Sequence, residues 1–199
     1  MMGMPQRPYH HGDLRAALLE GAERTLRDRG VAALSLRELA RETGVSHAAP
    51  GRHFKDKQAL LDALTLAGYE RLAQTLAAAD DPALPIEPRL TALARAYLGF
   101  AIENAELLEL MFARKHDPEA SARLTDAVDR SVGSFERLIA DAQRRGEIVE
   151  GDVEQITLVA AASLHGLASF SASGMLTREE AYAGVAGHVH HLLCGLKPR

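Results

Sequence analysis

Apolar residues recur at helical spacing along almost the whole of this 199-residue chain, and that spacing constrains the fold most strongly. Leu14, Leu18 and Leu26 fall on one face of a predicted helix that runs from Leu14 to Arg29 and ends at Gly30. No run of alternating β-branched residues is long enough for a convincing strand. The sequence therefore predicts an all-α protein.

Capping residues and helix breakers place the remaining helices. A capping box is predicted where Ser35 precedes Glu38, and a second one where Thr177 precedes Glu180. A proline-rich loop, residues 80–88, separates the early helices from the later ones. The predicted helices after the first are Leu36–Thr43, a short segment capped by Ser46, Lys57–Ala79 after the cap Asp56, Arg89–Asn104, Ala105–Phe112, Pro118–Arg145, Asp152–Ser171 and Thr177–Leu196.

The net charge of −4 conceals a difference between the two ends of the chain. Residues 1–60 hold ten Lys and Arg against seven Asp and Glu, whereas the remainder holds thirteen against twenty. The basic end is the candidate for a polyanionic partner, and the acidic remainder would keep the rest of the surface from binding nucleic acid. An excess this small also occurs on ordinary solvated surfaces, so the interpretation depends on motifs.

The composition excludes several functional classes. The single cysteine, Cys194, cannot form an intramolecular disulfide, no apolar run reaches the roughly 18 residues that span a bilayer, and the start lacks the apolar centre of a secretory signal. We therefore expect a cytoplasmic protein. His188 and His191 lack an adjacent acidic or cysteine ligand, so no metal site is predicted. No phosphate-binding loop, zinc-protease helix or nucleophile elbow is present, so we predict no catalytic residue, no cofactor and no enzyme.

The stretch "LRELARETGVSHAAPGRHF" has the spacing of a helix-turn-helix. Ala40 allows two helices to cross closely, and Gly44 can adopt a positive φ at a tight turn. Ser46 is a natural N-cap for a second helix, whose first turn, residues 47–49, would face outward. Small and polar side chains there suit an element that enters the major groove of DNA, although an αα-hairpin of an ordinary helical protein has the same pattern.

The longer stretch "ALSLRELARETGVSHAAPGRHFKDKQALLDAL" resembles the DNA-binding signature of the tetracycline-repressor (TetR) family of transcriptional regulators. The upstream "YHHGDLRAALLEGA" resembles the first helix of many members, so the similarity covers about residues 9–64. Farther along, "LHGLASF" resembles a His-Gly motif of one TetR subgroup, without the tryptophan usual there. The residues that match the family pattern are Ser35, Ala40, Gly44, Val45, Ser46, Phe54, Lys57 and Leu60.

The resemblance implies about nine helices in two domains. Residues 1–57 would form a three-helix helix-turn-helix DNA-binding domain, and residues 58–199 a helical ligand-binding and dimerisation domain. The implied protein is a homodimeric transcriptional regulator, typically a repressor, that binds a palindromic operator in double-stranded DNA. A small, mostly apolar ligand would release it. The alternative is a helical, dimeric ligand-binding protein whose DNA binding is weakened or lost.

By position, the resemblance also implies the residues that contact DNA. Ser35 and Lys57 would begin helices, where backbone amides and an ammonium group can hold phosphates. His47 and Ala48 could contact base edges and thymine methyl groups. The complete predicted DNA-binding set is Ser35, Arg37, Ser46, His47, Ala48, Gly51, His53 and Lys57.

Pro50 and Gly51 stand together in the middle of the predicted second helix. As its fourth residue, Pro50 would lose only one helical hydrogen bond. Similar family members carry tyrosine in place of Gly51, where its hydroxyl would contact a phosphate, and glycine costs about 1 kcal/mol of helix stability relative to alanine. We therefore expect weakened DNA binding. The opposite interpretation is that this glycine permits close approach of the backbone to a phosphate.

The second half of the chain carries two candidate functional surfaces. The predicted ligand-binding residues are Tyr97, Phe100, Met111, Phe112, His165 and Phe170, with His165 as the polar anchor. An ordinary core stripe with a hydrogen-bonded histidine is the alternative. The last two helices are predicted to pair with those of a second copy, through Val159, Ala162, Leu167, Val185, Val189, Leu192 and Leu193.

Overall fold

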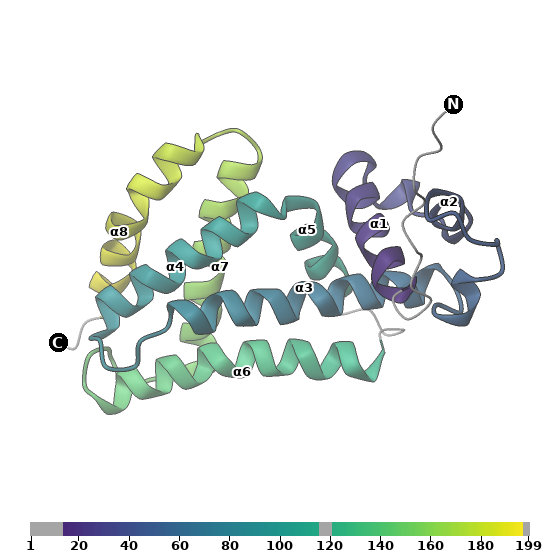
Figure 1. Cartoon of the computed structure of the whole chain (residues 1–199). Coiled ribbons are helices and arrows are strands. Elements are labelled where there is room, and N and C mark those ends of the chain that lie inside the picture. The colour runs from purple at the N-terminus through teal and green to yellow at the C-terminus, as the bar shows by residue number, and fades with distance from the viewer. Residues whose placement is uncertain (1–13, 116–120, 197–199) are drawn as a thin grey trace. The chain divides into compact units, whose positions relative to one another are not determined.

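The computed structural model describes residues 14–115 and 121–196, which hold eight α-helices, two short 3-10 helices and no strand (Figure 1). The all-α prediction is confirmed. Residue contacts divide the chain into two units, Met1–Leu64 and Thr65–Arg199, and the division falls inside α3, a little after the predicted boundary at residue 57. The elements are α1 (Leu14–Arg29), η1 (Val31–Ala33), α2 (Leu36–Glu42), η2 (Pro50–Arg52), α3 (Lys57–Ala79), α4 (Ile86–Glu103), α5 (Ala105–Arg114), α6 (Ala122–Arg144), α7 (Val153–Ala172) and α8 (Arg178–Cys194).

The first unit is built on α1, which packs against η1 and α2. Gly30 and Gly44 have φ values of 75° and 69°, so both terminate helices in the left-handed conformation expected of glycine. The guanidinium of Arg15 lies 5.4 Å from the centroid of the buried Phe54 ring, a distance at which a cation is attracted to the ring face. The side chains that are 2% exposed or less are Leu18, Ala22, Leu26, Leu34, Leu39, Ala40, Phe54, Leu60 and Leu64.

The predicted capping box at the start of α2 is wrong. Ser35 has the extended backbone of an N-cap, but its side chain makes no capping hydrogen bond. The Glu38 carboxylate instead lies 2.7 Å from Arg41 and 3.7 Å from Arg29. Since a guanidinium is a stronger partner for a carboxylate than a backbone amide, Glu38 is drawn away from the helix terminus.

Two other predicted caps form. Asp56 accepts a hydrogen bond of 2.8 Å from the amide of Ala59 at the start of α3. At the start of α8, the Thr177 hydroxyl accepts from the Glu180 amide at 3.1 Å, and the Glu180 carboxylate accepts from the Thr177 amide at 2.8 Å. The backbone bond from Thr177 holds the pKa of the Glu180 carboxyl below its usual value. These caps fix where the long helices begin.

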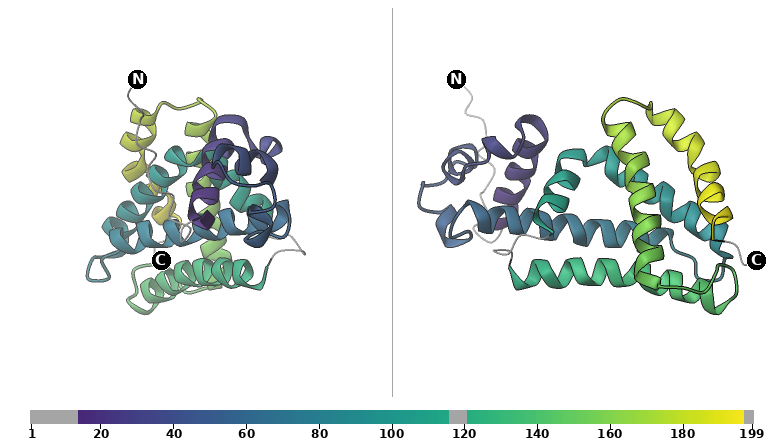
Figure 2. Two further views of the ribbon diagram at one scale, coloured as in Figure 1. Left: turned by 45° about the vertical axis from the view of Figure 1, so that its right-hand side comes forward. Right: turned by 180° about the vertical axis from the view of Figure 1, so that it is seen from behind.

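In the second unit α4 packs against α5, α7 and α8, and α6 packs against α7 (Figures 1 and 2). The prediction that Val185, Val189 and Leu193 face a second copy is wrong, because α8 uses that face inside its own chain and leaves them 0–4% exposed. α4 begins at Ile86, earlier than predicted, with Pro85 at its N-cap. The predicted start of the sixth helix at Pro118 lies outside the described residues.

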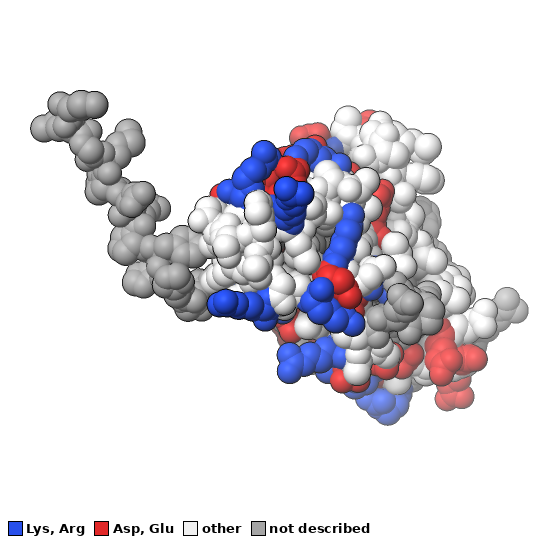
Figure 3. Space-filling view, turned by 90° about the vertical axis from the view of Figure 1, so that its right-hand side faces the viewer, with Lys and Arg blue, Asp and Glu red and all other residues white. Residues whose placement is uncertain are grey.

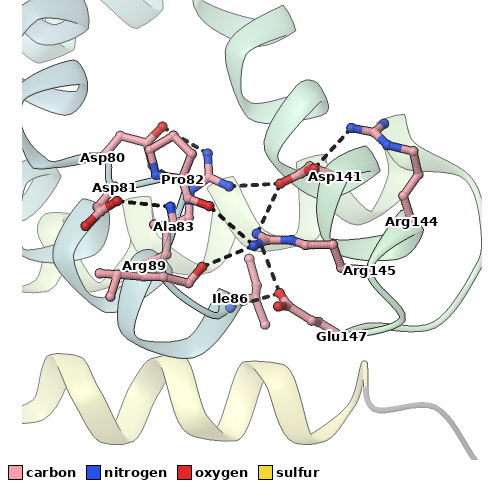
Figure 4. Close-up of polar contacts among 11 residues, drawn as sticks. Asp80, Asp81, Pro82, Ala83, Ile86, Arg89, Asp141, Arg144, Arg145 and Glu147 are labelled. Atoms are coloured by element: carbon pink, nitrogen blue, oxygen red, sulfur yellow. Dashed lines mark hydrogen bonds and ion pairs between the residues drawn. The ribbon is translucent and has the colours of Figure 1, made fainter.

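A buried arginine joins the loop after α3 to the end of α6 (Figure 4). The Arg89 side chain is 7% exposed and binds Asp80 twice, with Nε–Oδ1 at 2.6 Å and Nη2–Oδ2 at 3.0 Å. Its Nη1 lies 3.2 Å from Asp141 on α6. The hydrogen bond to Asp80 is the largest cause of a raised Arg89 pKa, so the guanidinium stays charged. Both of its acidic partners keep about a third of their surface in water, which lowers the cost of the burial.

Two further residues extend this contact. Arg145 lies 3.1 Å from Asp141 and donates at 3.3 Å to the carbonyl oxygens of Pro82 and Leu84 (Figure 4). Glu147 accepts a hydrogen bond of 2.9 Å from the first amide of α4, that of Ile86. Together, the polar contacts of this cluster connect the loop after α3, the start of α4 and the end of α6. Its members are Asp80, Arg89, Asp141, Arg145 and Glu147.

Substituting Arg89→Met should lower the free energy of unfolding by about 2 kcal/mol, because it leaves Asp80 and Asp141 facing each other without their shared cation. The matched control is Arg144→Met, since Arg144 contacts the same Asp141 at 3.1 Å but is 69% exposed. The control should change stability by less than about 0.5 kcal/mol. Urea denaturation followed by circular dichroism measures both, and equal losses would contradict the assigned role of burial.

Candidate DNA-binding surface and ligand cavity

The second helix of the predicted helix-turn-helix is not an α-helix, which corrects the prediction that Ser46 caps one. Hydrogen bonds between residues three apart, the 3-10 pattern, join the amide of Ala49 to Ser46 O at 2.9 Å and the amide of His53 to Pro50 O at 2.9 Å. The 3-10 helix η2 has its N-cap at Ala49. Pro50 has no amide to give to a longer helix, and Gly51 gives an α-helix the least support, so the segment tightens into 3-10 geometry.

This segment, residues 46–53, is held by buried anchors and presents most of its side chains to solvent. Pro50 is buried within it, and the fully buried Phe54 follows it. Of the predicted DNA-binding residues, Ser35 is half-buried. The exposed ones are Arg37, Ser46, His47, Ala48, Gly51, His53 and Lys57.

Lys57, predicted to hold a phosphate, is oriented by contacts inside the first unit. Its Nζ donates to Val31 O at 2.9 Å and to Ala32 O at 3.5 Å. These carbonyls belong to η1, so the ammonium group is fixed between η1 and the start of α3. A lysine has three N–H donors, and one remains for a phosphate oxygen.

Sequence reasoning missed two basic residues, one inside the segment and one just after it. Arg52 lies in η2 and is exposed, and Lys55 is 83% exposed with its Nζ 3.9 Å from Asp56. In Figure 3, which looks onto the first unit, Lys and Arg side chains are spread over the surface with acidic side chains between them. The positive charge of 1–60 was the signal that could have added both residues to the predicted set.

The second unit contains a cavity of about 500 Å³ with walls from α3, α4, α5, α6 and α7. Four of the six predicted ligand-binding residues, Tyr97, Met111, Phe112 and His165, line it together. The lining contributed by sequence positions that were not predicted is mostly apolar: Tyr69, Leu72, Leu93, Leu108, Val128, Val132, Phe135, Leu158, Ala161, Ala162 and Leu164.

The other two predicted lining residues lie elsewhere. Phe100 lines a separate, more open hollow together with Arg71 and Arg95. Phe170 is 48% exposed, because five residues beyond His165 it has turned by about 140° around the helix axis. Periodicity placed both on α4 and α7 without showing which hollow each side chain reaches.

The polar groups of the cavity are few. The Tyr97 hydroxyl lies 2.9 Å from His165 Nδ1, and the Phe112 ring centroid lies 4.3 Å from that of His165. Tyr69 donates to Met111 O at 3.4 Å. Burial raises the pKa of Tyr69 to about 12 and raises that of Tyr97 as well, so both phenols are neutral at physiological pH. The Thr157 hydroxyl, on the cavity wall, has no hydrogen-bond partner.

The α7 helix also carries an uncovered apolar surface, which includes Leu158 of the cavity lining. Leu158, Val159 and Phe170 are 48–64% exposed, and Met175 in the following loop is 67% exposed. By length and mean hydropathy alone, α7 is the one helix in the described part of the chain that could cross a membrane. Polar residues such as Ser163 interrupt the apolar sequence of α7. Its exposed apolar side chains therefore form a surface on the helix rather than a continuous apolar run.

Two family models match the chain. The model described as bacterial regulatory proteins, tetR family, matches residues 18–64, and that described as tetracyclin repressor-like, C-terminal domain, matches residues 90–192. The HTH-type transcriptional regulator Mb1846 of Mycobacterium bovis is 31% identical over 141 residues. That alignment covers 68% of this chain and 59% of the regulator, so the chain spans less than two thirds of this relative's length.

Solved structures show the same fold. A protein of unknown function from Rhodococcus sp. RHA1 is 44% identical, with a TM-score of 0.87 over 97% of this chain and 100% of that one. A bacterial regulatory protein in the tetR family from Rhodococcus RHA1 is 21% identical, with a TM-score of 0.75 over 94% and 98% of the two chains. At that lower identity the second likeness concerns the fold alone.

The two turn glycines should respond oppositely to the same substitution. A Cβ added at Gly51 meets no atom within 4 Å and the φ there is not left-handed, so Gly51→Ala should stabilise the protein by about 0.5 kcal/mol. Gly44 has a φ of 69°, so Gly44→Ala should destabilise it by about 1 kcal/mol. Urea denaturation gives both values, and a stability loss in Gly51→Ala would contradict the open environment described for it.

Proposed function

The chain belongs to the TetR family of bacterial transcriptional regulators, and on this premise we propose that it is a homodimeric, cytoplasmic repressor released from a palindromic operator by a small apolar ligand. The observation that carries the proposal is the segment 46–53, whose side chains face solvent while Pro50 and Phe54 anchor it. Family membership separates such a regulator from an enzyme.

DNA contact is proposed through the exposed turn and its basic neighbours. His47 and Ala48 would face base edges, where short side chains allow the backbone to approach the major groove. Arg52, Lys55 and Lys57 would contact phosphates, which supply most of the affinity and make it depend on salt. The internal hydrogen bonds of Lys57 support this role, because they hold the ammonium group in place before DNA arrives.

Dimerisation is proposed through the uncovered faces of α7 and α8. Leu158, Val159 and Phe170 supply apolar area, and Ala183 and Gly184 on α8 are small and exposed, which allows close helix approach. A second copy related by a twofold axis would present the same surface, so one patch covers the other. Two copies would also place two DNA-binding units on a palindrome that one unit binds poorly.

Release by ligand is proposed to work through α3, which starts in the first unit and continues into the second as one helix of 23 residues. Tyr69 and Leu72 of α3 line the cavity. A ligand that prefers one position of these side chains would shift the dimer between conformations with different separations of the DNA-binding units. The ligand acts only as far as its affinities for the two conformations differ.

The competing function is a dimeric ligand-binding protein that has lost DNA binding. Gly51 and the absence of an α-helix in 46–53 favour it, because a glycine in a 3-10 turn supplies neither a phosphate contact nor a stable helix. Fluorescence anisotropy with a labelled duplex of random sequence, titrated from low to high salt, separates the two. A repressor binds at low salt and weakens steeply as salt rises, whereas no binding at low salt identifies the competing function.

In the same titration, Gly51→Tyr should bind DNA about fivefold more tightly at fixed salt, because it adds a hydroxyl that can donate to a phosphate. The free protein accommodates the new side chain, since a Cβ at this position meets open space. Gly51→Phe is the control with the ring but no hydroxyl. Unchanged affinity in Gly51→Tyr would refute the lost contact, and reduced affinity would mean that the glycine itself lies against the duplex.

Sedimentation velocity at micromolar concentration should show a dimer, and Val159→Asp should raise its dissociation constant about tenfold or more by burying a charge between subunits. Val159 is 49% exposed, so the single chain should tolerate the substitution. Val31→Asp is the matched control, because Val31 is 42% exposed and belongs to the first unit, whereas α7 belongs to the second. A monomeric wild-type protein, or equal effects of both variants, would exclude this surface.

A further inference from the structure

We propose that the cavity takes an uncharged ligand with an apolar body and one hydrogen-bond-accepting oxygen, such as a ketone or ester, and that the Thr157 hydroxyl is its anchor. The inference rests on the proposed function for the cavity and specifies its ligand. Thr157 is 7% exposed, lies on the wall, and its Oγ1 makes no hydrogen bond. A buried polar atom without a partner is uncommon and costly in a folded protein.

Several other hydroxyls in these helices find an internal partner, whereas Thr65 on α3 also has a buried hydroxyl without one but does not line the cavity. Thr91 donates to Glu87 O at 2.8 Å, and Ser134 donates to Arg130 O at 2.9 Å, each four residues earlier in its helix. Thr157 has a residue of the same helix, Val153, at that position, but no such bond forms. Its donor therefore has no partner within the chain, on a residue that lines the cavity.

The Tyr97 hydroxyl already occupies Nδ1 of His165, which agrees with the alternative of a hydrogen-bonded core histidine rather than a ligand anchor. The hydroxyl and Nδ1 are 2.9 Å apart, so each fills a hydrogen-bonding position of the other. A hydroxyl carries one proton and two lone pairs, and an unmet donor is rarer in proteins than an unmet lone pair. The group that Thr157 lacks is therefore an acceptor.

The charges around the cavity favour a neutral ligand. Lys115 and Glu136 are half-exposed and Glu154 is exposed, so the lining's formal charges are at least partly in water. Neither a carboxylate near Lys115 nor an ammonium group near Glu154 would gain much from these partly solvated charges, and either ion would lose its hydration among the apolar walls.

Displacement of the neutral dye Nile red from the full-length protein tests this with three probes of equal chain length: 2-undecanone, undecanoate and undecylammonium. The ketone should bind about tenfold more tightly than either ion. Thr157→Val, which removes the hydroxyl but keeps the shape, should weaken ketone binding about fivefold to tenfold. Thr157→Ser should retain it. Thr91→Val, which alters a hydroxyl outside the cavity, is the control and should behave as wild type.

Each other result would overturn the inference: Thr157→Val equal to wild type, an ion that binds as tightly as the ketone, or no displacement by any probe. The dye reports on folding of the cavity in every variant, so a loss specific to the ketone is not confused with unfolding. No DNA is present in this measurement. A failed ligand prediction therefore leaves operator binding untouched, and a failed salt titration leaves the ligand result standing.

Discussion

A charge pairing around the buried Arg89 guanidinium links segments of the second unit that are far apart in the sequence. Arg89 can lie 7% exposed only because Asp80 and Asp141 share its charge and take up its N–H groups. These partners come from the end of α3 and from α6, so the pairing fixes three helices at one point. The walls of the cavity arise from the same helices, through Tyr69, Leu93 and Phe135 among others.

The cavity has neutral polar groups in its interior, whereas its charged lining residues keep contact with water. Its interior holds two tyrosines whose pKa values are raised by burial, and these remain uncharged. The formal charges of Lys115, Glu136 and Glu154 keep contact with water. Such a site favours neutral ligands over charged ones. A charged ligand loses its hydration without gaining a buried counter-ion, whereas an apolar ligand pays no such desolvation cost. In the proposal made above, the unmet donor of Thr157 then selects among neutral molecules.

The sequence predicted local structure well and long-range contacts poorly. The bounds of α1 and α3 agree with prediction, as do the capping box at Thr177 and the left-handed Gly44, because each depends on neighbours within one helical turn. The Arg89–Asp141 pair joins residues 52 apart, and no periodicity reveals it. The box at Ser35 failed because Glu38 pairs with Arg41 on its own helix at 2.7 Å and with Arg29 on α1 at 3.7 Å, and only the second contact is long-range.

The candidate sites show the same limit. Helical spacing showed that Tyr97 and Phe100 both face inward, but the structure places them in different hollows. The apolar spacing of α8 was read as a face for a second copy, whereas Val185 and Val189 are consumed by packing inside the chain. Apolar spacing predicts that a helix face is buried, but only the fold shows which element buries it. The exposed surface of α8 includes small residues such as Ala183 and Gly184, whereas α7 carries exposed large apolar side chains.

The segment 46–53 connects these arguments to DNA recognition. Pro50 O accepts hydrogen bonds from the amides of both His53 and Phe54 at 2.9 Å, one in the 3-10 pattern and one in the α pattern. The backbone therefore lies between two helical geometries that differ by a small rotation, and Gly51 removes the side chain that would favour either. A duplex that prefers the α form has to supply its ordering free energy from phosphate contacts. In the proposed complex, DNA affinity would depend on the cations around the turn, above all Lys57 with its internally bonded ammonium group, more than on a preformed helix.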